Sequence, residues 1–245
     1  MAGDASFAGM SATERNGGWA AVLFDLDGTL ADTVALILAC YRHTMRRHLG
    51  TERADAEWLQ GLGTPLRDQL RGFARSDEEA RPMLETYVSH QREIHDAMAC
   101  AFPGLTALLE SAAAHGTKLG LVTSKSREMG ERTLGCCGFG VSFDALVFAD
   151  DVRRGKPHPE PVRRALERLG APEPASVLFV GDSPHDVVAG RDAGVRTAAV
   201  LWGPFSAEVL AASGPDWILA DTPELAALIA AGPAGPARGD VGSES

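Results

Sequence analysis

Short apolar runs alternate with longer amphipathic segments along most of the chain. Most of these runs are apolar on successive residues, which is typical of strands buried on both faces of a parallel sheet. We predict strands over residues 20–24, 118–122, 144–149, 176–180, 197–201 and 216–220. Helical periodicity predicts helices over residues 103–115, 125–137, 158–170, 185–194 and 223–231. This alternation predicts an α/β fold with a doubly wound, mainly parallel sheet.

The interval from Ala31 to about Phe102 departs from this alternation. It contains no convincing strand, but helical periodicity is clear over residues 34–49 and 78–98, with a Gly-rich break at 61–66. So long a segment is not expected to be a loop, and we predict an inserted all-helical cap domain. The predicted boundaries are a core domain of residues 19–32 and 103–231 and a cap domain of residues 33–102.

The two ends of the chain differ in composition from the rest. Residues 1–18 and 232–245 are rich in Gly, Ala, Ser and Pro and lack periodic apolar residues, so we predict disordered tails. The first segment lacks a basic start and an apolar core, and we expect no signal peptide there.

Charge and apolar content exclude several classes of partner. No apolar stretch reaches the roughly 18 residues of a membrane span. A formal net charge of −10 opposes nonspecific binding to nucleic acid or anionic lipid. The cysteines include no C-x-x-C pair, and we expect all to be reduced core residues: Cys40, Cys100, Cys136 and Cys137. We therefore expect a cytoplasmic protein, a monomer or homodimer, that binds neither nucleic acid nor membranes.

Two carboxylates two residues apart, Asp25 and Asp27, end the first apolar run. Unpaired buried carboxylates cost several kcal/mol, so a compensating cation is expected nearby. Further polar residues follow the other predicted strands: Thr123, Ser124, Lys156, Asp182 and Asp186. Because ligands of open α/β sheets bind at the carboxyl ends of the strands, these groups are expected to converge on one site.

Each of these residues taken singly has an ordinary structural explanation. Asp25 could cap the next helix, Thr123 could end a strand, Lys156 could be solvated, and residues 181–186 could form a turn into a helix. The full set in this order favours a catalytic site, because clustered carboxylates need a cation and a cation with a lysine needs an anion.

The sequence resembles the haloacid dehalogenase superfamily of phosphohydrolases. The resemblance rests on DLDGTL at 25–30, LVTSK at 121–125, GKPHPEP at 155–161 and GDSPHD at 181–186, and it extends from residue 20 to about 230. Within the superfamily the chain most resembles the branch that contains phosphoglycolate phosphatase and the pyrophosphatase PpaX, which has a helical cap after the first motif. The cap is less similar than the core.

This resemblance implies a role for each motif residue. Asp25 would be the nucleophile that forms an aspartyl-phosphate, and Asp27 would protonate the leaving oxygen and later deprotonate water. Gly28 would allow a sharp turn, and Thr29 would hold both carboxylates in place. Mg²⁺ would be the cofactor, bound by Asp25, the Asp27 backbone carbonyl and Asp182, with Asp186 behind it. The phosphoryl oxygens would be held by Thr123, Ser124 and Lys156.

In the cap, polar residues are candidates for contact with the leaving group. The set comprises Gly63, Thr64, Arg67, His90, Arg92 and His95. Each has a structural alternative, since Arg and His on helices are usually solvated or satisfied locally.

The leading functional hypothesis is a Mg²⁺-dependent phosphatase acting on a small phosphate monoester: phosphoglycolate, a sugar phosphate or a phosphorylated biosynthetic intermediate. An inorganic pyrophosphatase is the first alternative. A phosphomutase, which returns the phosphoryl group to a sugar, is the second, although the GTL after the aspartates and the pyrophosphatase-like core favour water as acceptor. Asp27 and the intact metal set oppose a dehalogenase, and the complete motif set opposes an inactive binding protein.

Overall fold

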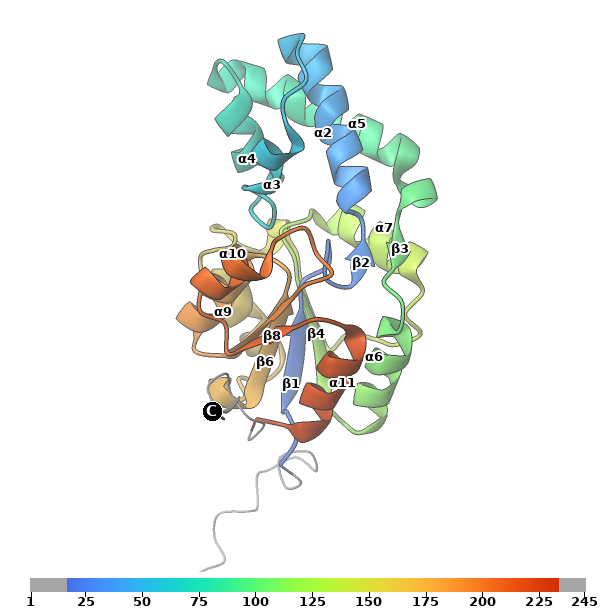
Figure 1. Cartoon of the computed structure of the whole chain (residues 1–245), viewed down its shortest axis with the longest axis vertical. Coiled ribbons are helices and arrows are strands. Elements are labelled where there is room, and N and C mark those ends of the chain that lie inside the picture. Colours follow the sequence, from blue (N-terminus) through green and yellow to red (C-terminus); the bar gives the residue numbers. More distant parts are fainter. Residues whose placement is uncertain (1–16, 234–245) are drawn as a thin grey trace, which may run out of the picture.

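A central parallel sheet organises the lower half of the molecule in Figure 1. The structure is a computed structural model and describes residues 17–233. The strand order is β5-β4-β1-β6-β7-β8, and every pair is parallel. The strands are β1 (Ala21–Phe24), β4 (Lys118–Val122), β5 (Ala145–Val147), β6 (Val177–Gly181), β7 (Arg196–Val200) and β8 (Trp217–Leu219).

Helices cover both faces of this sheet, as the continuous apolar runs predict. Along β1, Val22 and Phe24 pack with the side chains of α6 and α11, whereas Ala21 and Leu23 face the opposite side and pack with α8 and α9. The core helices are α6 (Leu105–Ala114), α7 (Arg127–Cys137), α8 (Glu160–Arg168), α9 (Pro184–Ala193), α10 (Ala207–Ala212) and α11 (Thr222–Ala231). Two short 3₁₀ helices lie at η1 (Ala149–Asp151) and η2 (Pro174–Ser176).

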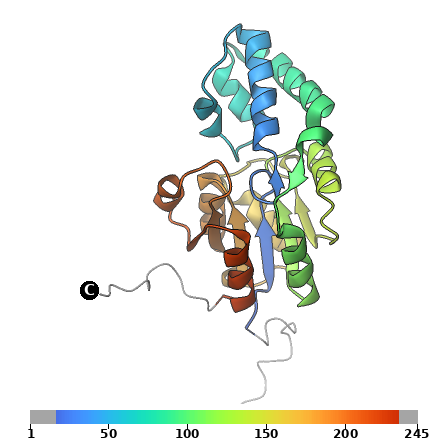
Figure 2. The same ribbon diagram turned by 45° about the vertical axis from the view of Figure 1, so that its right-hand side comes forward.

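A separate group of helices stands above the carboxyl ends of the strands (Figures 1 and 2). It consists of α2 (Val34–Leu49), α3 (Asp55–Leu59), α4 (Leu66–Phe73) and α5 (Asp77–Met98). These helices have an apolar cluster of their own, in which Trp58 stacks on Tyr41 and Tyr87. The cap is thus a helical unit with its own core, inserted after β1.

Two short antiparallel strands join the cap to the sheet domain. β2 (Ala31–Asp32) pairs with β3 (Cys100–Ala101), so the chain enters and leaves the cap side by side. A two-residue strand is too short to show a hydrophobic pattern, so periodicity does not predict these two strands.

The fold class is confirmed, with an α/β core, a mainly parallel sheet and an inserted helical cap. All six predicted strands are present, and β5 and β8 are the shortest, with three residues each. Periodicity did not predict α3, α4 and α10, which have five, eight and six residues. The boundaries assigned to the core and the cap stay a prediction. The predicted tails lie almost wholly outside the described residues.

The cysteines only partly match the expectation of reduced core residues. All four are free, but only Cys40 is buried, whereas Cys100 and Cys136 are exposed. Cys136 lies at the exposed junction of α7 with α5, where its Sγ contacts Asp96.

Candidate active site

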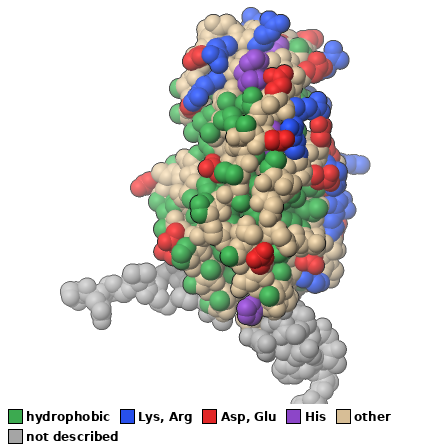
Figure 3. Space-filling model, turned by 90° about the vertical axis from the view of Figure 1, so that its right-hand side faces the viewer, with side chains coloured by type: hydrophobic (Ala, Val, Ile, Leu, Met, Phe, Trp, Pro, Cys, Tyr) green, Lys and Arg blue, Asp and Glu red, His purple; other side chains and the backbone are tan. Residues whose placement is uncertain are grey.

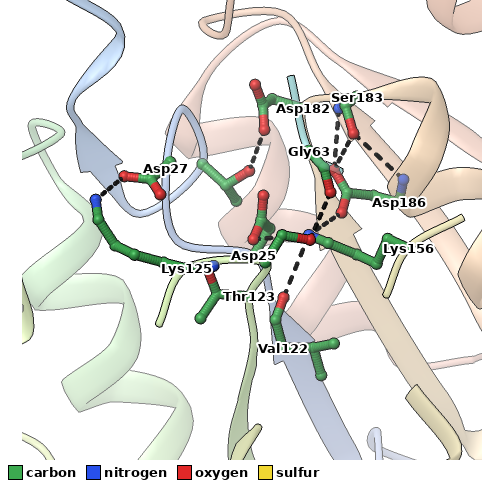
Figure 4. Close-up of polar contacts among 12 residues, drawn as sticks. Asp25, Asp27, Gly63, Val122, Thr123, Lys125, Lys156, Asp182, Ser183 and Asp186 are labelled. Atoms are coloured by element: carbon green, nitrogen blue, oxygen red, sulfur yellow. Dashed lines mark hydrogen bonds and ion pairs between the residues drawn. The ribbon is translucent and has the colours of Figure 1, made fainter. Parts of the chain in front are cut away.

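The carboxyl ends of β4, β1 and β6, three neighbouring strands, carry the main polar groups of the site. Asp25 follows β1 directly, Thr123 follows β4, and Asp182 follows β6. The three strands are parallel and adjacent, so residues about 150 positions apart in sequence meet at one edge (Figure 4). Lys156 reaches the same place from the loop after η1.

Lys156 is the centre of the hydrogen-bond network. Its Nζ lies 2.8 Å from an Asp25 oxygen, 2.5 Å from an Asp186 oxygen and 3.4 Å from the Val122 carbonyl oxygen. Its side chain is 1% exposed. Burial lowers the pKa of Lys156, but Asp186 and Asp25 outweigh burial and raise it above its ordinary value. The ammonium is therefore a fixed positive charge beside Asp25.

Negative charge at this edge exceeds positive charge. Carboxylate oxygens of Asp25, Asp182 and Asp186 lie within 4.8 Å of one another, all on buried residues. Burial raises the pKa of Asp25 to about 7, although Lys156 acts against it, and burial also raises the pKa of Asp182 well above its ordinary value. Three carboxylates against one ammonium leave two formal negative charges, which a divalent cation would balance.

Asp182 has the oxygen best suited to such a cation. Thr29 Oγ1 donates to Asp182 Oδ1 at 3.0 Å, whereas Asp182 Oδ2 is buried and has no hydrogen-bond partner in the described part of the chain. Gly28 has a φ of +80°, and a Cβ there would overlap the Asp182 carboxylate. An orphaned carboxylate oxygen beside further oxygen donors fits Mg²⁺.

Asp186 is occupied by protein partners. Its Oδ1 accepts from Lys156, and its Oδ2 accepts from the Ser183 backbone N–H at 3.1 Å and from Ser183 Oγ at 2.6 Å. This is the capping box of α9, which fixes Asp186 at the third position of the helix.

Asp27 points away from this cluster (Figure 4). Its Oδ1 accepts from Lys125 Nζ and, at 2.6 Å, from Thr33 Oγ1. Thr33 is the residue before α2, but its hydroxyl bonds Asp27 and does not cap the helix. Neither Lys125 nor Thr33 was among the candidates from the sequence. The only signal was the position of Lys125 directly after Thr123 and Ser124.

Thr29, Thr123 and Ser124 have specific contacts. Thr29 was expected to hold the carboxylates of its own loop, but its hydroxyl bonds Asp182 instead. Thr123 Oγ1 accepts from the Lys125 N–H at 3.1 Å, and Ser124 Oγ donates to the Gly63 carbonyl oxygen at 2.6 Å. The second contact joins the core to the cap beside the carboxylate cluster.

A cavity of about 1090 Å³ extends from the carboxylates into the cap. Of the expected cap residues, Gly63, Thr64 and Arg67 line it. Thr64 Oγ1 donates to the Gly61 carbonyl at 2.6 Å, and the Gly63 backbone has a φ of +93° where it approaches Ser183.

The structure places His95, His90 and Arg92 outside this cavity. His95 is fully buried at the junction of α5 with α7, where its Nε2 lies 2.9 Å from Thr133 Oγ1. Arg92 forms an ion pair with Glu128 of α7, and His90 stacks on His43 on the cap. Basic and acidic side chains lie next to one another on this face of the molecule (Figure 3).

A parallel sheet with a carboxylate and lysine cluster at its carboxyl edge, under a helical cap, defines a class of α/β hydrolase. The model of the haloacid dehalogenase-like hydrolase family matches residues 22–200. The chain therefore belongs to the haloacid dehalogenase-like hydrolase family. The resemblance drawn from the four motifs is confirmed, as is the expectation of a phosphatase-type hydrolase.

Individual relatives agree with this assignment. Pyrophosphatase PpaX of Bacillus velezensis is 39% identical over 199 residues, which cover 81% of this chain and 91% of the relative. The structure of a haloacid dehalogenase-like hydrolase from Bacteroides fragilis is 28% identical with a TM-score of 0.78, over 84% of this chain and 99% of the other. The crystal structure of a predicted phosphoglycolate phosphatase from Haemophilus somnus shares the fold at 22% identity, with a TM-score of 0.76 over 84% of this chain and 96% of the other.

None of the helices within residues 17–233 has the length and apolar character that crossing a membrane requires.

Proposed function

We propose that the protein is a Mg²⁺-dependent phosphatase that hydrolyses a small phosphate monoester through an aspartyl-phosphate on Asp25. The observation that supports this most is the buried cluster in which Asp25, Asp182 and Asp186 outnumber the single ammonium of Lys156. Such a cluster favours a divalent cation, and a cation beside a lysine attracts a phosphate.

Asp25, Asp182 and the backbone carbonyl of Asp27 are the proposed ligands of Mg²⁺. When bound, the ion would neutralise charge on the phosphoryl oxygens, as hard cations with oxygen ligands do. Asp186 is a weaker ligand candidate because Lys156 and Ser183 occupy its oxygens. Its proposed role is to hold Lys156.

Asp25 is the proposed nucleophile. One of its oxygens forms a bond to phosphorus while the bond from phosphorus to the leaving oxygen breaks, and water later releases inorganic phosphate from Asp25. The ammonium of Lys156, 2.8 Å from Asp25, offsets part of the cost of keeping this buried carboxylate ionised. The Thr123 hydroxyl, the Ser124 backbone N–H and Lys156 would hold the phosphoryl oxygens.

Asp27 is the proposed general acid and base. It would give its proton to the leaving oxygen in the first step and take a proton from water in the second. Lys125 and Thr33 hold its carboxylate beside the cavity, from the loop after β4 and from the start of α2 respectively. Because Thr33 lies where the chain enters the cap, a shift of the cap would move Asp27.

Inorganic pyrophosphate is the second candidate substrate, and the name of the Bacillus velezensis relative favours it. The same groups of the core would act on either substrate, and only the leaving group differs. The choice between the two substrates therefore depends on the residues of the cap that contact the leaving group.

The proposal is tested by release of inorganic phosphate, with Mg²⁺ or with EDTA, from phosphoglycolate, sugar phosphates and pyrophosphate. Asp25→Asn should lower turnover by at least about a thousandfold while the protein stays folded. Asp32→Asn, an exposed aspartate, is the matched control and should keep full turnover. Substantial turnover by Asp25→Asn would contradict the assignment, and transfer of phosphate to a sugar would identify a mutase.

Three further expectations stay predictions. They are a cytoplasmic location, a monomeric or homodimeric state, and the absence of nucleic-acid binding.

A further inference from the structure

The cavity above the carboxylates is bounded by a cap that already contacts the core on two sides. On one side, Ser124 Oγ lies 2.6 Å from the Gly63 carbonyl oxygen. On the other, His95 Nε2 of α5 lies 2.9 Å from Thr133 Oγ1 of α7. The cavity of about 1090 Å³ therefore lies between a cap and a core that already contact each other at two places. Pockets for drug-sized ligands measure roughly 300–1,000 Å³, far more than two phosphoryl groups need.

One wall of the cavity is a continuous face of α5. Leu84, Val88 and Gln91 line it, and their spacing of four and three residues places them on one side of the helix. From Leu84 to Gln91 this face extends about 10 Å along the helix axis. Leu66 and Phe73, at the two ends of α4, also line the cavity. The wall is therefore apolar over a length suited to an organic group.

Gln91 is a polar group set into this apolar wall. Its side chain is 5% exposed, and its carboxamide makes no hydrogen bond to any residue between 17 and 233. Gln91 lies one helical turn before His95, which contacts the core, so it is at the end of the wall nearest the carboxylates. Because its amide still contacts the solvent that fills the cavity, a ligand hydroxyl or carbonyl would replace water there as its hydrogen-bond partner.

Trp58 offers a second unused donor. It lines the same cavity, is 1% exposed, and its indole Nε1 has no partner among the residues described. An indole N–H donates only, and because this one has no solvent contact, the ring would have to shift before it could pair with an oxygen of a ligand. Both unused groups are neutral.

Charged groups of the cap lie at the exposed rim of the cavity. Arg67 and Arg71 line it there together with Glu57 and Asp68, and Arg71 lies 3.8 Å from Asp68. The α5 wall contributes no Lys or Arg to the lining. The cations that line the cavity lie outside the α5 wall, so a leaving group seated against that wall would meet no positive charge. They are Arg67 and Arg71 of the cap and Lys125, Arg153, Arg154 and Lys156 of the core.

We propose that the group released by hydrolysis is a neutral organic alcohol, with an apolar face against Leu84 and Val88 and a further hydroxyl or carbonyl paired with Gln91. This inference rests on the proposed function and narrows its substrate class. On this inference the enzyme prefers an organic phosphate ester to pyrophosphate, because the α5 wall is apolar.

The first test compares phosphate release by the wild-type protein with Mg²⁺ from glucose 6-phosphate, 1-naphthyl phosphate, phosphoglycolate and pyrophosphate. The two esters with neutral leaving groups should have kcat/KM values at least about tenfold above those of the other two. A preference for phosphoglycolate would overturn this inference and leave the proposed monoester phosphatase standing. A preference for pyrophosphate would overturn this inference and replace the monoester substrate of the proposed function with the second candidate. No release from any of the four would count against both.

The second test uses Gln91→Leu. This variant should raise the KM for glucose 6-phosphate about tenfold, because a hydrogen bond to a sugar hydroxyl is lost. The KM for 1-naphthyl phosphate, whose leaving group has no further hydroxyl, should change less than about twofold. Gln60→Leu makes the same chemical change at an exposed position and should match the wild type. Equal losses on all probes would show that Gln91 only supports the fold, and would overturn the assignment.

Discussion

Lys156 Nζ and Asp25 Oδ1 lie 2.8 Å apart inside a site from which solvent is nearly excluded, the two side chains being 1% and 5% exposed. Asp25 comes from the end of β1 and Lys156 from a loop more than a hundred residues later. This ion pair joins the proposed nucleophile to the group proposed to hold the phosphate. The buried carboxylates of Asp25 and Asp186 therefore depend on the Lys156 ammonium as their partner.

Lys156→Met should destabilise the protein strongly. The change leaves Asp25 and Asp186 buried without their ammonium partner, and breaking a buried ion pair in this way costs about 3–5 kcal/mol. The free energy of unfolding, measured with urea in EDTA, checks this. Lys118→Met alters an exposed lysine that contacts only the Leu169 carbonyl and should cost less than about 1 kcal/mol. Similar values for the two variants would contradict the account of the cluster.

Mg²⁺ should stabilise the wild-type protein but not Asp182→Asn. Binding to the folded state alone adds about 2.7 kcal/mol at a ligand concentration one hundred times Kd. In EDTA the variant should be at least as stable as the wild type, because it loses a buried carboxylate whose pKa burial raises. Thermal unfolding with and without Mg²⁺ measures both effects. Equal stabilisation of the two proteins would place the metal elsewhere.

Lys125→Met should lower kcat by about tenfold or more and leave KM nearly unchanged. The lysine contacts Asp27 and not the carboxylate cluster, so its loss should misplace the proposed general acid without weakening substrate binding. Steady-state kinetics on one substrate separate the two parameters, and Lys118→Met again serves as the control. A higher KM with unchanged kcat would show that Lys125 binds substrate directly.

His95 should make stability depend on pH. Burial lowers the pKa of His95 in the folded protein, although its contact with Asp96 acts against burial. The unfolded chain then binds the proton more readily, so stability is complete above the ordinary pKa of about 6.5 and falls as pH decreases below it. His95→Gln should show a smaller loss of stability between about pH 7 and pH 5. An equal or larger loss in the variant would contradict this sign.

The residues of the core were predictable because each follows a strand directly. Asp25, Thr123 and Asp182 come after continuous apolar runs, and parallel strands bring their carboxyl ends to one edge. No side-chain packing was needed for that prediction. The direction of Asp27 was not predictable in the same way, because Lys125 and Thr33 decide it through contacts between separate loops.

The two long helices of the cap, α2 and α5, were predictable from periodicity, but the residues of α5 that line the cavity were not. His95 and Gln91 lie one turn apart on α5, yet His95 packs on α7 and Gln91 lines the cavity. Which of them meets a substrate depends on the angle at which α5 crosses the core. Periodicity gives the faces of a helix but not its orientation in the fold.

The central claim is a covalent intermediate on Asp25, and rapid-quench mass spectrometry of the wild-type protein during turnover tests it most directly. With Mg²⁺ and a substrate that it hydrolyses, the peptide containing Asp25 should carry a phosphoryl group, and the corresponding peptide of Asp25→Asn should not. Turnover without a phosphoryl group on that peptide at any quench time, or with the group on another residue, would contradict the account.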